Sequence, residues 1–410
     1  MKLPAQGRAP EELFAEMHRR KEEDADWRAG RTFSLVYPAG DEVDDVLRQA
    51  NELYMFENAL NPLRFPSLKS MERDVVEMTG AMLHAPEAAG GCLTSGGTES
   101  ILLAVKTARE RARLDRGVTD PVMLAPVTAH PAFAKAAHYF GLEHVQIPIG
   151  RDLRADVAAA EALIDERTAF MMGSAPNYPH GMIDPIPELA ALASERGIHF
   201  HVDSCLGGFQ LPFWERLGEP IPPFDFRVPG ISTLSADVHK YGYCTKGASV
   251  LLHANKDVMQ LRQAFIYHEW PGGIYGSLAM AGARPAAPIA AAWAVMNYLG
   301  EEGYLRLAQA VRDTTRALQK GIEAIEPLQV VGEPAMGVFA FRSTSDAVDV
   351  MAVGDGMDDR GWCLDRQHGP DALHLMISPE HAKVVETFLA DLRTCVSDAG
   401  EARGVEARYS

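Results

Sequence analysis

The stretch Ser235–Gly247 (SADVHKYGYCTKG) contains Lys240, directly after His239 and before small, polar and aromatic residues. Apolar runs at residues 230–235 and 248–253 flank it and are typical of β-strands. Burial at a strand end disfavours the charged form of a lysine, and a neutral amine is a nucleophile toward aldehydes. A lone lysine is usually a surface residue with its ammonium in water. Only the motifs elsewhere in the chain indicate that Lys240 instead reacts with an aldehyde.

Strand-like and helical segments alternate upstream of Lys240, which is the pattern of βαβ units and a mainly parallel sheet. Strands are expected at residues 122–126, 144–147, 169–174 and 198–202, with helices at 101–113, 131–140, 155–164 and 186–196. A long helical stretch follows (279–299, then 302–325), and residues 328–398 mix strands with helices. The sequence therefore predicts an α/β protein with a helical arm at residues 1–64, a large domain at 65–300 and a small α+β domain at 301–410.

The composition, with 47% hydrophobic and 23% charged residues, is that of a soluble globular protein. The 39 basic and 56 acidic residues give a formal net charge of −17, which argues against binding to nucleic acid or anionic membranes. No run reaches the ~18 consecutive apolar residues of a spanning helix, and the N-terminus lacks a signal-peptide pattern. The five cysteines are scattered and lack zinc-ligand spacing, so we expect reduced thiols, no metal site and a cytoplasmic location.

A glycine-rich stretch, Thr94–Thr98 (TSGGT), opens a predicted helix. Glycines let backbone N–H groups form a concave row, and the helix N-terminus adds partial positive charge, so the stretch favours a bound phosphate. It is neither a Walker motif nor GxGxxG, and taken alone it could equally be a capped turn. A second glycine-rich segment, Trp270–Ser277, is either another anion contact, across a dimer interface, or an ordinary loop.

Two polar residues follow predicted strands. Asp203 ends the strand at 198–202, and ligands of parallel sheets bind at the carboxyl ends of strands. A carboxylate buried there needs a positive partner, such as a pyridinium nitrogen; otherwise it would cap the next turn. His130 would lie flat on a pyridine ring, or serve as a helix-capping or core residue. The glycine-rich stretch at residues 94–98 is called the phosphate cradle below. Together with this cradle and Lys240, Asp203 and His130 provide the contacts that pyridoxal phosphate requires.

Five motifs closely resemble those of sphingosine-1-phosphate lyases, members of the group II pyridoxal phosphate-dependent decarboxylase family. They are residues 94–100 (TSGGTES), 174–184 (SAPNYPHGMID), 201–213 (HVDSCLGGFQLPF), 235–247 and 272–285 (GGIYGSLAMAGARP). The similarity covers about residues 31 to 395. It implies the aspartate-aminotransferase-like fold (fold type I), with a mainly parallel seven-stranded sheet. It also implies a homodimer with a shared active site.

The resemblance implies roles for individual residues. Lys240 would form a Schiff base with pyridoxal phosphate, Asp203 would pair with the ring nitrogen, and His130 would stack on the ring. Residues near the ring or the substrate would be Cys205, Lys246 and Tyr241. The cofactor's phosphate would be held by Gly97, Thr98, His239 and, from the neighbouring subunit, Ser277.

The sequence departs from the lyase pattern at residues 61–64. The lyases carry Asn-x-x-His and a short insertion, where this chain has NPLR and no insertion. Because the family histidine helps to hold the substrate's phosphate, we expect Asn61 and Arg64 to contact the substrate, Arg64 through a phosphate or carboxylate. Ser204 and Leu278 stand where the lyases have alanine and proline. We expect no membrane anchor of the kind that eukaryotic lyases carry.

The motifs favour a carbon–carbon lyase. It would cleave a phosphorylated amino alcohol, such as a sphingoid base phosphate, to an aldehyde and phosphoethanolamine by retro-aldol cleavage of the substrate's Schiff base. The same residues would serve an amino-acid decarboxylase, the alternative that Arg64 favours. A catalytically silent dimeric scaffold is a third alternative, and the intact Lys240 and Asp203 argue against it.

Overall fold

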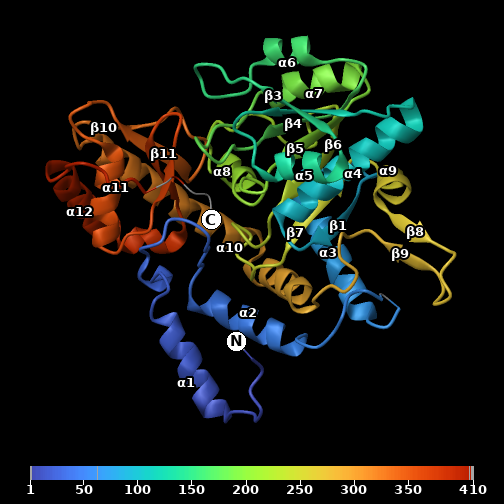
Figure 1. The fold of residues 1–410 in the computed structure, drawn as a ribbon, viewed down its shortest axis with the longest axis horizontal. Helices are drawn as coiled ribbons and strands as arrows, with labels where there is room; N and C mark the ends of the chain where they lie inside the picture. The colour runs from blue at the N-terminus through green and yellow to red at the C-terminus, as the bar shows by residue number, and fades with distance from the viewer. Residues whose placement is uncertain (1, 62, 406, 408–410) are drawn as a thin grey trace.

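A seven-stranded sheet forms the centre of the larger part of the chain in the computed structural model, which describes residues 2–61, 63–405 and 407 (Figure 1). Neighbouring strands are parallel from β3 to β6, while β7 is antiparallel to both β6 and β1. In order across the sheet the strands are β1 (Gly90–Thr94), β7 (Ser249–His253), β6 (Ile231–Ala236), β5 (His199–Asp203), β4 (Thr168–Ser174), β2 (Val122–Pro126) and β3 (Glu143–Ile147). The predicted α/β fold with a mainly parallel seven-stranded sheet is confirmed.

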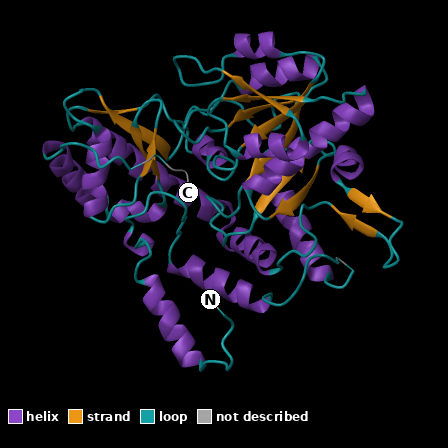
Figure 2. Cartoon of the chain, in the orientation of Figure 1, coloured by secondary structure: helices purple, strands orange, loops and turns teal. Residues whose placement is uncertain are grey.

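Helices cover both faces of this sheet (Figure 2). In β2, Met123 packs in an apolar cluster with helices α4 and α5, while Leu124 packs in a separate cluster with Leu189 of α7. Strands buried on both faces are nearly continuous apolar runs, and this explains why the sequence revealed them. The helices are α3 (Pro66–Met82), α4 (Gly97–Arg116), α5 (Ala132–Phe140), α6 (Val157–Leu163), α7 (Ile186–Glu195), α8 (Leu211–Arg216), α9 (Lys256–Val258) and η2 (Met259–Gln263).

The long helix α10 (Ala287–Glu323) connects the large sheet to a second sheet. It begins at Ala287, later than the predicted residue 279. The chain before it forms a hairpin of β8 (Phe265–Tyr267) and β9 (Tyr275–Ser277). A break at Gly300, whose φ is 53°, lies within the gap predicted at 300–301. The second sheet is antiparallel, and its elements are β10 (Leu328–Val330), β11 (Val338–Ser343), β13 (Ala372–Met376), β12 (Asp365–Gln367), α11 (Val350–Asp359), η3 (Pro379–Lys383) and α12 (Val385–Ser397).

The N-terminal arm consists of α1 (Pro10–Lys21), η1 (Trp27–Ala29) and α2 (Asp41–Leu53), and α2 packs against α10. The helix α1 buries none of its residues in this chain. The predicted boundaries at 64/65 and 300/301 fall between α2 and α3 and at the break in α10. The division into domains stays a prediction. Within the described ranges, every helix is either too short or too polar to cross a membrane.

Candidate active site

A cavity of about 290 Å³ lies at the carboxyl ends of β4, β5 and β6. The parallel register places Ser174 opposite Asp203, and Asp203 opposite Ser235. Because β7 is antiparallel, its first residue, Ser249, lies opposite Thr94 at the end of β1. The loops that follow β1, β4, β5 and β6 therefore meet at one edge of the sheet, where ligands of such sheets bind.

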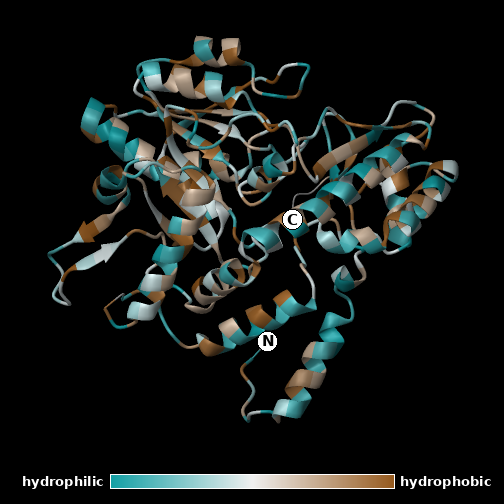
Figure 3. Cartoon of the chain, turned by 180° about the vertical axis from the view of Figure 1, so that it is seen from behind, coloured by the Kyte–Doolittle hydropathy of each residue, from teal (hydrophilic) through white to brown (hydrophobic). Residues whose placement is uncertain are grey.

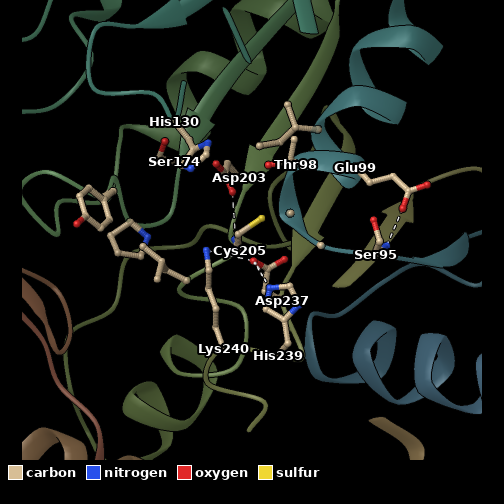
Figure 4. A pocket seen from close by; sticks show the side chains of 16 residues that line it. Ser95, Thr98, Glu99, His130, Ser174, Asp203, Cys205, Asp237, His239 and Lys240 are labelled. Atoms are coloured by element: carbon tan, nitrogen blue, oxygen red, sulfur yellow. Dashed lines mark hydrogen bonds and ion pairs between the residues drawn. The ribbon is translucent and has the colours of Figure 1, made fainter. Parts of the chain in front are cut away.

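The phosphate cradle at the start of α4 forms one wall of the cavity, which residues 95–98 line. The Glu99 carboxylate accepts a hydrogen bond from the backbone N–H of Ser95 at 2.7 Å and so fixes the turn (Figure 4). A Cβ atom on Gly97 would lie 2.7 Å from Sγ of Cys205. Only a glycine at this position keeps the cradle open beside Cys205.

Lys240 enters the cavity from the loop between β6 and β7. Its Nζ lies 3.1 Å from Oδ2 of Asp237, whose side chain is only 1% exposed. Burial by itself would raise the pKa of Asp237, but the charge of Lys240 and the hydrogen bond from His239 outweigh burial and hold that pKa below its usual value. His239 Nδ1 accepts a hydrogen bond from the N–H of Ala248 at 3.2 Å, so its Nε2 carries the proton that faces Asp237. The Asp237 carboxylate therefore stabilises the ammonium form of Lys240, whereas burial alone would favour the neutral amine.

Asp203 and His130 line the cavity together, and Figure 4 shows the Lys240 side chain extending toward them. The Asp203 carboxylate accepts hydrogen bonds from the N–H of Cys205 at 3.1 Å and from the hydroxyl of Ser235 at 3.4 Å. Burial lowers the pKa of His130, and its Nδ1 accepts a hydrogen bond from the backbone of the next turn. Burial also raises the pKa of the Cys205 thiol well above its usual value. The site therefore combines a fixed carboxylate, a neutral imidazole and a protonated thiol.

Seven of the predicted site residues line this cavity: Gly97, Thr98, His130, Asp203, Cys205, His239 and Lys240. Five do not: Asn61, Arg64, Tyr241, Lys246 and Ser277.

Among those five, the ring of Tyr241 is fully buried and its hydroxyl donates to the carbonyl of Gly337 at 3.3 Å. Lys246 donates to the carbonyl of His239 at 3.0 Å, and desolvation and the charge of Lys240 lower its pKa. The predicted substrate contacts of Tyr241 and Lys246 stay predictions.

The remaining predicted residues lie on the surface of the chain. Asn61 and Arg64 are exposed, and Pro62 between them lies outside the described residues. Ser277 sits on β9, where its hydroxyl accepts a hydrogen bond from the N–H of Ala279 at 3.1 Å. Neither place gives these side chains a position on the cavity wall of their own chain.

The lining residues that the sequence analysis did not single out include Ser174, Tyr178 and Asp237. Asp237 stands three residues before Lys240, and this spacing within a tight turn was the available signal. Ser174 and Tyr178 belong to the motif at 174–184. The Tyr178 hydroxyl donates to Asp365 on β12 at 2.6 Å, which connects the cavity wall to the second sheet. That contact joins residues far apart in the chain and has no local sequence signature.

These residues fit pyridoxal phosphate by their chemistry. An amine is present for the aldehyde, a carboxylate for the ring nitrogen and a neutral imidazole for the face of the ring. A glycine-rich helix N-terminus with hydroxyl groups is present for the phosphate. The position that a Gly97 side chain would fill is left open beside these groups.

Comparison with known proteins agrees with this assignment. The family model for the pyridoxal-dependent decarboxylase conserved domain matches residues 33–344. A sphingosine-1-phosphate lyase of Arabidopsis thaliana is 42% identical over 402 residues, which cover 96% of this chain and 73% of that protein. Sphingosine-1-phosphate lyase 1 of Rattus norvegicus is 39% identical and covers 96% of this chain and 69% of its own length.

Solved structures show the same likeness. A sphingosine-1-phosphate lyase of Burkholderia pseudomallei superimposes with a TM-score of 0.93 at 41% identity, over 97% of this chain and 93% of that chain. A glutamate decarboxylase of Lactobacillus brevis superimposes with a TM-score of 0.85 at 19% identity, over 99% of this chain and 96% of that chain. The second likeness is one of fold.

Proposed function

Because this chain belongs to the pyridoxal-dependent decarboxylase family, and within it to the sphingosine-1-phosphate lyases, we propose that it cleaves the carbon–carbon bond of a phosphorylated amino alcohol. The chain is a pyridoxal phosphate-dependent lyase. The products would be an aldehyde and phosphoethanolamine. The observation that carries the proposal is the identity with these lyases over nearly the whole chain.

Bound pyridoxal phosphate supplies an electron sink for the electron pair released when a bond to the amine-bearing carbon breaks. Lys240 would hold the cofactor covalently as a Schiff base, and the cradle at residues 95–98 with His239 would hold its phosphate. Asp203 would place its negative charge beside the ring nitrogen and so favour the protonated form of that nitrogen. His130, neutral because burial lowers its pKa, would lie against the ring without adding a competing charge.

Asp237 determines the protonation of the Lys240 amine. The carboxylate of Asp237 holds a proton on Nζ whenever Lys240 is not joined to the cofactor. Cys205 stays protonated, because burial raises the pKa of its thiol, so it adds no second anion beside Asp203.

The test is a product assay on purified enzyme with a phosphorylated sphingoid base and, separately, a panel of amino acids. We expect aldehyde from the phosphorylated base, and none from the Lys240→Ala variant. Carbon dioxide from an amino acid without aldehyde would identify a decarboxylase instead. Protein without the yellow absorbance of a bound imine, even after pyridoxal phosphate is added, would identify the silent scaffold.

We further propose that the enzyme is a homodimer and that Ser277 serves the partner's site. The β8–β9 hairpin projects from the body of the chain, and β8 is strongly apolar (Figure 3). Phe265 and Ile266 are 58% and 57% exposed, and Ile274 in the same hairpin is 74% exposed. Clustered apolar exposure of this kind marks an interface. A second copy that covers the hairpin would bring Ser277 close to that copy's cradle.

Hybrid dimers test this arrangement. Ser277→Asp, whose carboxylate would repel the phosphate, and Lys240→Ala are each expected to be inactive alone. Mixed subunits should regain about a quarter of wild-type activity, because about half of the dimers are hybrid and each hybrid has one intact site. A mixture as inactive as its components, or a monomer in light scattering, would contradict the proposal.

We propose that Asn61 and Arg64 also reach the substrate from the partner subunit. Both are exposed, and Leu63 between them is 84% exposed. Arg64→Ala should raise KM for the phosphorylated base more than it lowers kcat, because a surface guanidinium contributes mainly to binding. An unchanged KM would show that Arg64 lies away from the substrate.

We also propose that the protein works in the cytoplasm. Its five cysteines are all free thiols in the structure, which suits a reducing compartment. Fractionation of cells that express the tagged protein would test the proposal, and recovery from an oxidising compartment would contradict it.

A further inference from the structure

Buried polar side chains form a continuous hydrogen-bonded line across β5 and β6. A guanidinium nitrogen of Arg111, on α4, lies 3.3 Å from Nδ1 of His199. Nε2 of His199 lies 2.9 Å from the hydroxyl of Thr233, and that hydroxyl lies 2.9 Å from Nδ1 of His201. His199 and Thr233 are 2% and 0% exposed, so water does not complete these contacts.

The line continues from His201 to the cavity. Nε2 of His201 lies 3.2 Å from the hydroxyl of Ser235, which donates to Oδ1 of Asp203 at 3.4 Å. The thiol of Cys205 donates to the same Ser235 oxygen at 3.2 Å. Ser235 Oγ thus uses both lone pairs and its single proton. This line, from Arg111 to Asp203, is called the histidine line below.

The register of the two strands produces this alignment. Alternate residues of a strand face the same side, so His199, His201 and Asp203 share one face of β5. A register shift between Phe200 and His201 places His201 opposite Thr233 and Asp203 opposite Ser235. The hydroxyls of Thr233 and Ser235 therefore each fall between two polar groups of β5.

The direction of every hydrogen bond in the histidine line follows from its first residue. Arg111 can only donate, so Nδ1 of His199 accepts and its proton sits on Nε2. That proton goes to Thr233, whose own proton must then go to Nδ1 of His201. His201 consequently carries its proton on Nε2 and donates to Ser235, which leaves the Ser235 proton for Asp203. Burial keeps both rings neutral, since it lowers the pKa of His201 to about 4 and that of His199 well below its usual value.

We propose that His199 and His201 are positioning residues. Through Thr233 and Ser235 they keep the Ser235 hydroxyl donating its hydrogen bond to the Asp203 carboxylate, and this bond orients the carboxylate toward the cofactor's ring nitrogen. The inference rests on the proposed role of Asp203. His253, on the neighbouring strand β7, stands outside the line, because its Nε2 bonds to Gln263 at 2.6 Å. Neither histidine touches the reacting atoms, and both act through the two hydroxyls.

The first test is nitrogen-15 NMR of the histidine rings, in the enzyme with and without pyridoxal phosphate. We expect neutral rings with the proton on Nε2 for both His199 and His201. A proton on Nδ1, or a charged ring, at either residue would overturn the proposal. The cofactor-free measurement does not depend on the reaction, so it stands even if the proposed substrate is wrong.

The second test breaks the line at its centre. Thr233→Val removes the hydroxyl at nearly constant shape, and Thr233→Ser keeps it; Thr315→Val is the control, since Thr315 is also buried but donates within its own helix at 2.7 Å. With nitrogen-15-labelled pyridoxal phosphate bound, the ring nitrogen should shift toward its unprotonated position in Thr233→Val. The value of kcat should fall about tenfold, because Ser235 then loses the neighbour that directs its hydrogen bond to the charged Asp203. Thr233→Ser and the control should match the wild type.

Ser235→Ala keeps the test decisive if Thr233→Val does not fold. It should give the same nitrogen shift, because it removes the proton that reaches Asp203. An unchanged ring-nitrogen signal in whichever of these two variants folds would overturn the proposal. Asp203→Asn distinguishes failure of the role proposed for Asp203 from failure of the histidine line alone. If this variant also leaves the nitrogen-15 signal of the ring nitrogen unchanged, the role proposed for Asp203 is wrong.

Discussion

The ion pair between Asp237 and Lys240 gives the most direct test of the site. Its atoms are 3.1 Å apart, and the two side chains are 1% and 19% exposed. At an effective dielectric constant of about 20, unit charges at that distance attract by about 5 kcal/mol. Asp237→Asn removes the charge and keeps the shape. Even a quarter of that attraction, about 1.4 kcal/mol, changes the ratio of neutral amine to ammonium on Lys240 about tenfold.

Only the neutral amine adds to an aldehyde, so Lys240 of the Asp237→Asn variant should react faster with added pyridoxal phosphate. Stopped-flow absorbance of the cofactor-free enzyme, from neutral to alkaline pH, measures this rate. We expect at least a tenfold increase near neutral pH and a rate profile displaced to lower pH. Asp225→Asn is the control, because Asp225 is equally buried but pairs with Arg227. A rate equal to or below that of the wild type, with the control unchanged, would refute the assignment of Asp237 as the partner that holds the proton.

Three further predictions concern the cofactor and stability. Lys240→Ala should lose the imine absorbance and keep its circular dichroism; retained absorbance would place the Schiff base on another lysine. Gly97→Ala should weaken cofactor binding at least tenfold in equilibrium dialysis, since its Cβ would meet Cys205 Sγ at 2.7 Å, and Cys205→Ala should restore part of the loss. The free energy of unfolding should fall as pH drops from about 6.5 to about 4, because burial lowers the pKa of His374 and His381 to about 4 and unfolding lets both bind protons. His381→Gln should flatten that fall in urea titrations, and an identical slope would contradict the assignment.

The order of the motifs determined much of the site. Asp203 and His130 each follow an apolar strand, and Lys240 follows another, so a parallel sheet had to bring them to one edge. The fold and cofactor could be predicted for the same reason, because continuous apolar runs and glycine-rich turns are local features of the sequence. The hairpin at 265–277 could not, since its two strands have only three residues each, too few to show a strand pattern in the sequence.

The nucleophilic role of Lys240 could be inferred from the sequence alone. Its charge depends on the tertiary structure, which places the Asp237 carboxylate against it. The same holds for Asp203, whose strand position is evident from the sequence while its hydrogen bond from Ser235 depends on strand register. Residue type and spacing are local properties of the chain. The distance between two charges, and the direction of a buried hydrogen bond, arise only when separate strands pack, and these set the protonation states on which the chemistry depends.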